Sequence, residues 1–160
     1  MAKKYWLMKT EPSVFSFEDL VKAPGKTTPW EGVRNYQARN LMRDEFQLGD
    51  LAFIYHSGIA EPEIAGIAEI AKTGYADPFA MDSKSKYYDA DAKKKGVNPW
   101  ILVDVKAKKR FKKSVTRSQL KDCKALAGMM VLKKGARLSV QPVTEAEFKT
   151  ICDLTTSENV

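Results

Sequence analysis

The chain has 160 residues, of which 44% are hydrophobic and 29% are charged, and its formal net charge is +7 at pH 7. This is the size of one domain, and the hydrophobic content is too high for a disordered chain. Apolar runs are all shorter than the roughly 18 residues that a membrane-spanning helix needs. Composition therefore predicts a globular protein without a membrane partner.

Few reactive side chains are available for catalysis or metal binding. The only cysteines, Cys123 and Cys152, do not form a CxxC motif, and His56 is the only histidine. A zinc site needs about four clustered Cys or His ligands, and phosphate-binding loops need clustered glycines, whereas here the glycines are scattered. We therefore expect no metal and no cofactor.

Positive charge is concentrated in the second half of the chain. Residues 84–137 contain 17 basic and 4 acidic residues, and the densest run spans 106–113. Aromatic residues lie within the same segment. This pattern is typical of a face that holds a phosphate backbone, and it indicates Lys108, Lys109 and Arg110 as phosphate contacts. A solvated strand end is the structural alternative.

The first half of the chain reads as alternating strands and helices. Ser16 is a good helix N-cap followed by acidic residues, and apolar residues recur at helical spacing between 35 and 46. A Pro/Gly-rich stretch separates these helices. The predicted elements are a strand at 5–8, a helix at 16–21, a loop at 24–33, a helix at 35–46 and an antiparallel strand pair at 51–55 and 64–70.

The second half begins with a polar excursion at 76–98, which is long for a loop within a compact domain. A strand at 100–105 then enters the basic run. Capping boxes at Thr116–Gln119 and Thr144–Glu147 predict two helices, with a strand at 138–142 between them. The sum is an α+β fold with a mostly antiparallel sheet, curled into a barrel or pseudo-barrel, and packed helices.

Four segments together resemble a known family. They are Tyr5 to Pro12 (YWLMKTEP), Trp30 to Asn40 (WEGVRNYQARN), Tyr55 to Ser57 (YHS) and Arg137 to Pro142 (RLSVQP). In this order they resemble the EVE domain, a branch of the PUA-like fold, and most of all the thymocyte nuclear protein family. The resemblance covers residues 4–154 as a single domain and leaves 155–160 as a short polar tail.

The resemblance implies a reader of modified bases. EVE domains are similar to YTH domains, which hold a methylated adenine in an aromatic-lined pocket, and the implied ligand is a modified cytosine such as 5-methylcytosine or 5-hydroxymethylcytosine in DNA or RNA. By position, the resemblance implies a pocket aromatic, one wall at the end of the first strand and another wall at 55–57. These residues are Trp30, Lys9, Glu11, Tyr55, His56 and Ser57. Tyr75 and Trp100 are candidates for a second aromatic.

The same residues have a chemistry of their own. Trp30 lies in a Pro/Gly loop before a helix, where it is either a stacking surface for a base or part of the core. Asn35 begins that helix, either as a pocket residue or as its N-cap. Arg34 lies at the helix start and is a predicted phosphate contact. Arg39 and Arg43, one turn apart, either contact phosphate or form an exposed helix face. His56 is equally compatible with a structural role, and Lys9 with a salt bridge to Glu11.

Two other functions compete with the reader. Lys9, Thr10 and Glu11 are residue types used by small amidohydrolases of the related ASCH group, and a lysine can activate a hydroxyl. Consecutive strand residues point to opposite faces, however, so Thr10 should face away from Lys9 and Glu11. A protein-interaction module is the third reading. We expect a non-enzymatic monomer that is cytoplasmic, nucleoid-associated in a prokaryote and nuclear only in a eukaryote.

Overall fold

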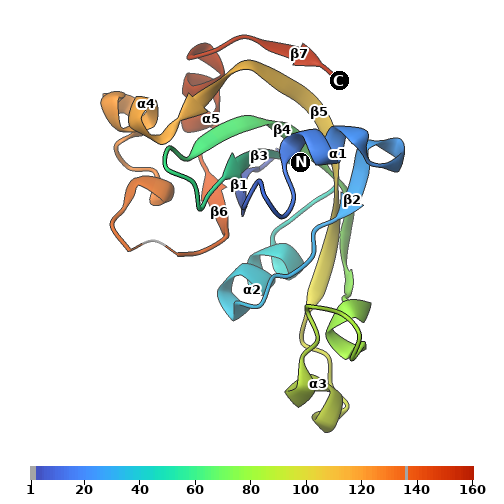
Figure 1. Ribbon diagram of the computed structural model, residues 1–160. Coiled ribbons are helices and arrows are strands. Elements are labelled where there is room, and N and C mark those ends of the chain that lie inside the picture. The colour runs from blue at the N-terminus through green and yellow to red at the C-terminus, as the bar shows by residue number, and fades with distance from the viewer. Residues whose placement is uncertain (1–2, 136) are drawn as a thin grey trace.

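A curved, mixed sheet with helices on both faces forms the body of the computed structural model, which describes residues 3–135 and 137–160 (Figure 1). The strands are β1 (Tyr5–Thr10), β2 (Thr27–Pro29), β3 (Leu51–His56), β4 (Glu63–Ala76), β5 (Ile101–Thr116), β6 (Val140–Val143) and β7 (Ser157–Asn159). Their order is β2-β5-β4-β3-β1-β6, with β7 also paired to β5.

Only β1 and β3 pair in parallel; every other pair among the described strands is antiparallel. The predicted α+β class is therefore confirmed, and so is the antiparallel pair formed by β3 and β4. The sheet is curled, with register shifts along β4 and β5, but the path of described strands runs from β2 to β6 and does not close into a barrel.

Most helices begin where the sequence signals predict, whereas the helix at 90–95 lies in the segment that the sequence predicts as a polar excursion. They are α1 (Phe17–Lys22), α2 (Tyr36–Asp44), α3 (Ala90–Lys95), α4 (Arg117–Asp122) and α5 (Glu145–Asp153), with 3-10 turns η1 (Pro24–Lys26), η2 (Pro78–Met81), η3 (Lys124–Leu126) and η4 (Met130–Leu132). Both predicted capping boxes form at α4 and α5, and Ser16 forms a third with Asp19. Within the described residues no helix is both long and apolar enough to cross a membrane.

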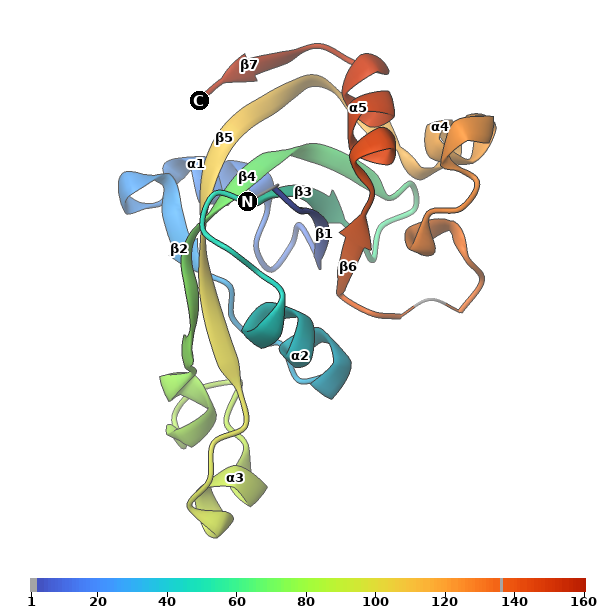
Figure 2. The same cartoon turned by 180° about the vertical axis from the view of Figure 1, so that it is seen from behind.

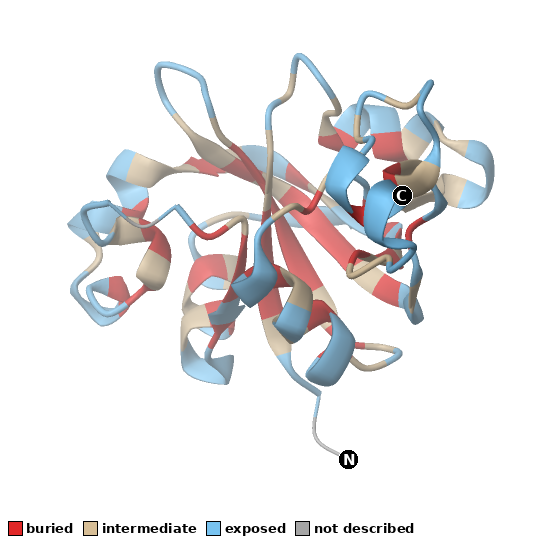
Figure 3. Cartoon of the chain, turned by 90° about the horizontal axis from the view of Figure 1, so that it is seen from below, coloured by how far each residue is buried: buried red, intermediate tan, exposed pale blue. Residues whose placement is uncertain are grey.

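The buried residues lie along the central strands and on parts of the helices that cover them (Figure 3). Strand alternation divides this core into two clusters on opposite faces of the sheet. Trp6 and Met8 of β1 belong to the first cluster, beneath α1 and α2, whereas Leu7 belongs to the second, beneath α4 and α5. Neighbouring residues of a strand therefore point to opposite faces of the sheet. This alternation decides which residues at the end of β1 face the candidate site.

Three segments differ from the sequence prediction. The basic run is a continuation of β5, because Ala107, Phe111 and Val115 alternate with exposed lysines and are buried. The predicted loop at 24–33 contains β2, which pairs with β5 at the sheet edge, where proline is tolerated. The predicted polar tail contains β7, which pairs with residues 109–111 of β5.

The excursion at 77–100 connects the far ends of β4 and β5 and contains η2 and α3. In Figures 1 and 2 it forms the foot of the long β4–β5 ribbon, below α2. Its residues return toward the chain around β2 and α2, where the candidate site lies.

Candidate nucleic-acid interface

A small pocket opens where β1, β2 and the excursion meet. We call it the Trp30 pocket; its volume is about 170 Å³, and it is lined by Thr10, Val14, Phe15, Thr28, Pro29, Trp30, Glu31, Lys86 and Tyr87. Sites for drug-sized ligands have volumes of roughly 300–1,000 Å³, so this pocket suits one small planar group. Its lining combines aromatic, hydroxyl and charged side chains, which is the combination that an extruded base requires.

Trp30 is held rigidly in this wall. Its backbone N–H donates to the Val103 carbonyl of β5 at 2.8 Å, and its side chain is 6% exposed. The Phe15 ring meets it edge-on, with 6.5 Å between ring centroids and 89° between ring planes. The Thr10 hydroxyl donates to the Phe15 carbonyl at 2.7 Å. Trp30 therefore belongs to the core, as one of its two sequence-based interpretations predicts, and it also lines the pocket. Its role as a stacking surface for a base stays a prediction.

Tyr87, from the excursion, is a third aromatic residue of the pocket lining, and sequence reasoning did not assign it to the pocket. Its ring packs against Gly32: a Cβ built on Gly32 would lie 2.5 Å from the Tyr87 Cε1 atom. Gly32 also has a φ of +82°, a conformation that other residues adopt only at a cost. A glycine two residues after Trp30 is the one sequence signal for this close approach.

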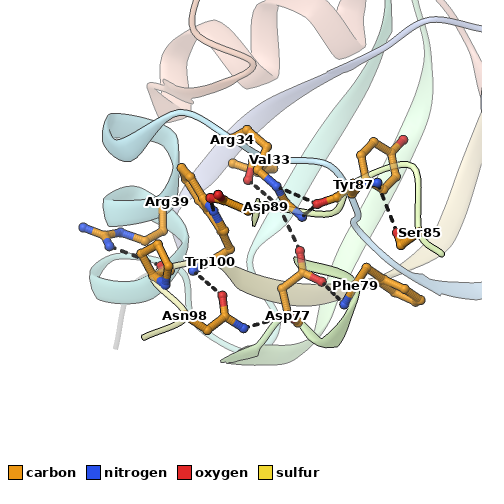
Figure 4. Close-up of polar contacts among 11 residues, drawn as sticks. Val33, Arg34, Arg39, Asp77, Phe79, Ser85, Tyr87, Asp89, Asn98 and Trp100 are labelled. Carbon is orange, nitrogen blue, oxygen red and sulfur yellow. Dashed lines mark hydrogen bonds and ion pairs between the residues drawn. The ribbon is translucent and has the colours of Figure 1, made fainter. Parts of the chain in front are cut away.

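Arg34 ties the excursion to the pocket wall (Figure 4). Its Nε and Nη2 donate to the Tyr87 carbonyl at 3.2 and 2.6 Å, and its Nη1 pairs with Asp77 Oδ2 at 2.9 Å. The Asp77 side chain is fully buried, and its other oxygen accepts the Phe79 N–H at 2.8 Å. Arg34 thus makes internal contacts with Asp77 and Tyr87, and the phosphate contact predicted from the sequence stays a prediction.

At the end of β1 the structure places Thr10, and not Lys9 or Glu11, in the pocket wall. Thr10 shares a face with Met8 and the first core cluster, whereas Lys9 shares a face with Leu7 and the second. Burial and the nearby Arg117 lower the pKa of the Lys9 ammonium. Glu11 is exposed, and its carboxyl group lies over Gly58 at the adjoining strand end.

The three residues predicted for the other wall lie outside the pocket lining. Tyr55 is buried in the second core cluster, and this burial raises the pKa of its hydroxyl. His56 Nε2 accepts the Phe17 N–H at 3.1 Å, so Nδ1 carries the proton and faces Glu63 at 3.2 Å. The Ser57 N–H donates to the Thr10 carbonyl at 3.0 Å. These residues fix the strand end and the start of α1 beside the pocket.

Asn35 and the two aromatic candidates have structural contacts elsewhere. Asn35 is the N-cap of α2, and its Oδ1 accepts the Ala38 N–H at 3.0 Å. The Tyr75 hydroxyl donates to Asp104 at 2.6 Å, and burial, together with this carboxylate, raises the pKa of Tyr75. Trp100 is buried, donates to Asp89 at 2.7 Å and stacks on Tyr36. Neither aromatic lines the Trp30 pocket.

The other predicted phosphate contacts are arginines that bind neighbouring protein groups and lysines that are exposed to solvent. Arg43 pairs with Asp44, and Arg110 pairs with Glu18 through two contacts of 2.7 Å. Arg39 donates to the Asn40 side chain and the Pro99 carbonyl. Lys108 and Lys109 are exposed, with no ion pair to any described residue, at the middle of β5. In the part of the chain that the structure describes, no cluster of three or more His, Cys, Asp or Glu could hold a metal ion.

Comparisons with known proteins agree on one family. The EVE domain model matches residues 4–154. Human thymocyte nuclear protein 1 is 40% identical over 96% of this chain and 75% of its own length. A hypothetical protein from Leishmania major has a solved structure with a TM-score of 0.88 and 43% identity, covering 96% of this chain and 94% of that one.

A second solved structure is that of human THYN1 protein in complex with 5-methylcytosine containing DNA. It has a TM-score of 0.86 and 38% identity, and the match covers 95% of this chain and 97% of that one. An ASCH protein from Zymomonas mobilis, with a TM-score of 0.57 and 9% identity, shares the fold alone.

Proposed function

This chain belongs to the EVE domain family, and from that membership we propose that it binds nucleic acid carrying a modified cytosine, with the base held in the Trp30 pocket. The similarity to human THYN1, whose structure was solved with 5-methylcytosine containing DNA, supports this ligand class. The protein acts as a binding module, and the modified base is its ligand rather than a substrate.

The observation that carries the proposal is the composition of the Trp30 pocket. Phe15, Trp30 and Tyr87 surround it with aromatic rings, and stacking on such rings contributes about 1–3 kcal/mol per base. The Thr10 and Thr28 side chains supply polar groups for the edge of the base. A methyl group is recognised by apolar contact, which Val14 and Pro29 provide in the same wall.

The phosphate backbone is held by exposed basic residues, led by Lys108 and Lys109. The exposed ion pairs of Arg43 and Arg110 contribute little to stability, so these arginines can exchange a carboxylate for a phosphate. Arg34 acts differently, because its partner Asp77 is fully buried. It positions Tyr87 and the excursion.

The hydrolase reading has weaker geometric support. Thr10 lines the pocket, whereas Lys9 lies on the face of the second core cluster, so these two side chains do not act on one substrate in this pocket. The ASCH protein shares only the fold. The proposed function therefore needs no catalytic residue, and the monomeric state and the cytoplasmic or nucleoid location stay predictions.

The direct test is a titration at fixed salt with matched single- and double-stranded oligonucleotides carrying cytosine, 5-methylcytosine or 5-hydroxymethylcytosine. We expect at least a tenfold preference for a modified base, about 1.4 kcal/mol. Trp30→Leu keeps apolar volume in the core but removes the stacking surface, and should abolish the preference. Tyr36→Ala, on the exposed face of α2, is the matched control and should retain it.

The outcomes separate the readings. Equal, salt-sensitive binding to all oligonucleotides would leave only a basic face and refute the base-reading pocket. A folded Trp30→Leu variant with full preference would refute the assignment of the pocket. Release of a base or an amine from a modified nucleoside, abolished by Lys9→Ala, would favour the hydrolase.

A further inference from the structure

A second, larger hollow lies beside the Trp30 pocket at the edge of the sheet. Its volume is about 640 Å³, and we call it the β2–β7 groove. On the outer edge of β5, β2 pairs with residues 104–106 and β7 pairs with residues 109–111. The groove lies at the interruption between these two short strands. It is lined by Val21, Ala23, Gly25, Lys26, Lys106, Ala107, Lys108, Asn159 and Val160.

The charged side chains of this lining are all lysines. Lys26, Lys106 and Lys108 contribute three positive charges, and no acidic side chain is part of the lining. None of the three has an ion pair with a described residue, in contrast to Arg34, which is paired with Asp77. Three like charges around one hollow repel each other, and an anionic ligand relieves that repulsion.

Lys26 reaches this position through an unusual backbone. Its φ is +55°, and it is the only non-glycine residue with a positive φ in the described chain. Such a conformation costs of the order of 1–3 kcal/mol and persists only where the surroundings enforce it. Here the Lys26 N–H donates to the Ala23 carbonyl at 2.7 Å, and the Thr27 hydroxyl donates to the Gly25 carbonyl at 2.9 Å. The turn therefore directs the chain from α1 into β2 with Lys26 at the rim of the groove.

The groove and the Trp30 pocket are joined by β2. Lys26 immediately precedes β2, whereas Thr28 and Pro29 of β2 line the pocket. A strand rises about 3.3 Å per residue, so the two hollows are separated by roughly the length of one or two nucleotides. Val21, Ala23, Ala107 and Val160 are apolar members of the groove lining, and its polar side chains are Asn159 and the three lysines.

We propose that the β2–β7 groove binds the sugar–phosphate backbone of the strand on one side of the modified base, with Lys26, Lys106 and Lys108 as the phosphate contacts. The proposal rests on the proposed function, because the Trp30 pocket fixes where the strand begins. It adds a direction: the strand leaves the pocket along β2 toward β7. Phosphate contacts supply affinity without sequence information, so the groove serves any sequence around the modified base.

The test compares two triple variants that each remove three positive charges. Lys26→Gln/Lys106→Gln/Lys108→Gln changes the groove. Its matched control changes exposed lysines at and beyond α4, which lies on the far side of the sheet from β2 in Figures 1 and 2. The control substitutions are Lys121→Gln, Lys124→Gln and Lys133→Gln. Dissociation constants are measured between 50 and 200 mM salt with duplex oligonucleotides that contain cytosine or 5-methylcytosine.

For the groove variant we expect the slope of log affinity against log salt to become shallower by about 3, one for each lysine. Over this fourfold change in salt, the wild-type affinity then falls about 60-fold more than the variant's. The ratio of affinities for modified and unmodified cytosine should be unchanged. The control variant should keep a slope close to wild type.

Short single strands with nucleotides on only one side of the 5-methylcytosine test the direction. The groove variant should weaken binding of one such oligonucleotide and leave the one with the opposite flank unchanged. Equal effects on both flanks, or equal slopes for the groove and control variants, would overturn the proposal.

The failure of this proposal and the failure of the base pocket are distinguishable. If the wild-type protein shows no preference for a modified base but its salt slope depends on the three lysines, the base-reading role of the Trp30 pocket is refuted. The groove then remains a general phosphate site. If the wild-type protein shows full preference but the groove variant has the same salt slope, only the phosphate-binding role of the groove is refuted. Absence of binding at low salt refutes both.

Discussion

Gly32→Ala perturbs the Trp30 pocket without removing any of its lining side chains. The new Cβ would lie 2.5 Å from Tyr87 Cε1 and 2.8 Å from Cζ. Unstrained carbon atoms are separated by about 3.5–4.0 Å, so the ring must retreat by roughly 1 Å. The φ of +82° adds a backbone cost of about 1–2 kcal/mol.

Two separate losses are expected from this substitution. The free energy of unfolding should fall by about 1–3 kcal/mol, measured by urea denaturation. The preference for 5-methylcytosine over cytosine should fall about 5–10-fold, which corresponds to about 1–1.4 kcal/mol. This is part of the stacking contribution of one aromatic ring. Both values are measured at the same salt concentration, so that phosphate contacts do not enter the ratio.

Gly49→Ala is the matched control, because Gly49 has a similar φ of +87° and nothing within 4 Å of its Cβ position. It should lose stability but keep the preference. In a Tyr87→Ala background, Gly32→Ala should have no further effect on the preference, since the ring that it displaces is gone. The reasoning is refuted if a folded Gly32→Ala protein retains full preference, or if its effect persists without the Tyr87 ring.

Two further predictions concern ion pairs. Arg34→Met leaves the Asp77 carboxylate buried without a cation, so the free energy of unfolding should fall by about 3–5 kcal/mol. Asp77→Asn in the same chain should restore part of this loss. A double variant no more stable than Arg34→Met alone would contradict the prediction. The Arg110 guanidinium lowers the pKa of the Glu18 carboxyl, so this pair stabilises the fold above the unfolded-state pKa of about 4.3 and the contribution is lost as pH falls through the lower folded-state value. Glu18→Gln should make the free energy of unfolding less dependent on pH below about pH 5. The effect is small because both side chains are substantially exposed. Urea midpoints at pH 3, 4 and 5 are each compared with the midpoint at pH 7, and equal differences for variant and wild type would exclude the effect.

The sequence alone determined the local structure, because short-range signals govern it. Thr116 and Thr144 form the capping boxes that their spacing predicts, and Ser16 is the predicted N-cap of α1. The antiparallel pairing of β3 with β4 follows from two apolar runs joined by a short loop. The four motifs also predict an EVE domain, which the family model confirms over residues 4–154, and the structure places Trp30 in the lining of a small pocket.

Tertiary structure decided which side chains face the pocket, because those contacts join residues far apart in the sequence. The alternation of β1 predicts that Lys9 and Thr10 diverge, but only packing of the two core clusters shows that Thr10 faces the pocket. Arg34 finds its buried partner 43 residues away in Asp77. Tyr87 reaches the pocket because the β4–β5 ribbon returns the excursion to Gly32. Such long-range partners are set by the path of the sheet, whereas each local signal extends over only three or four residues.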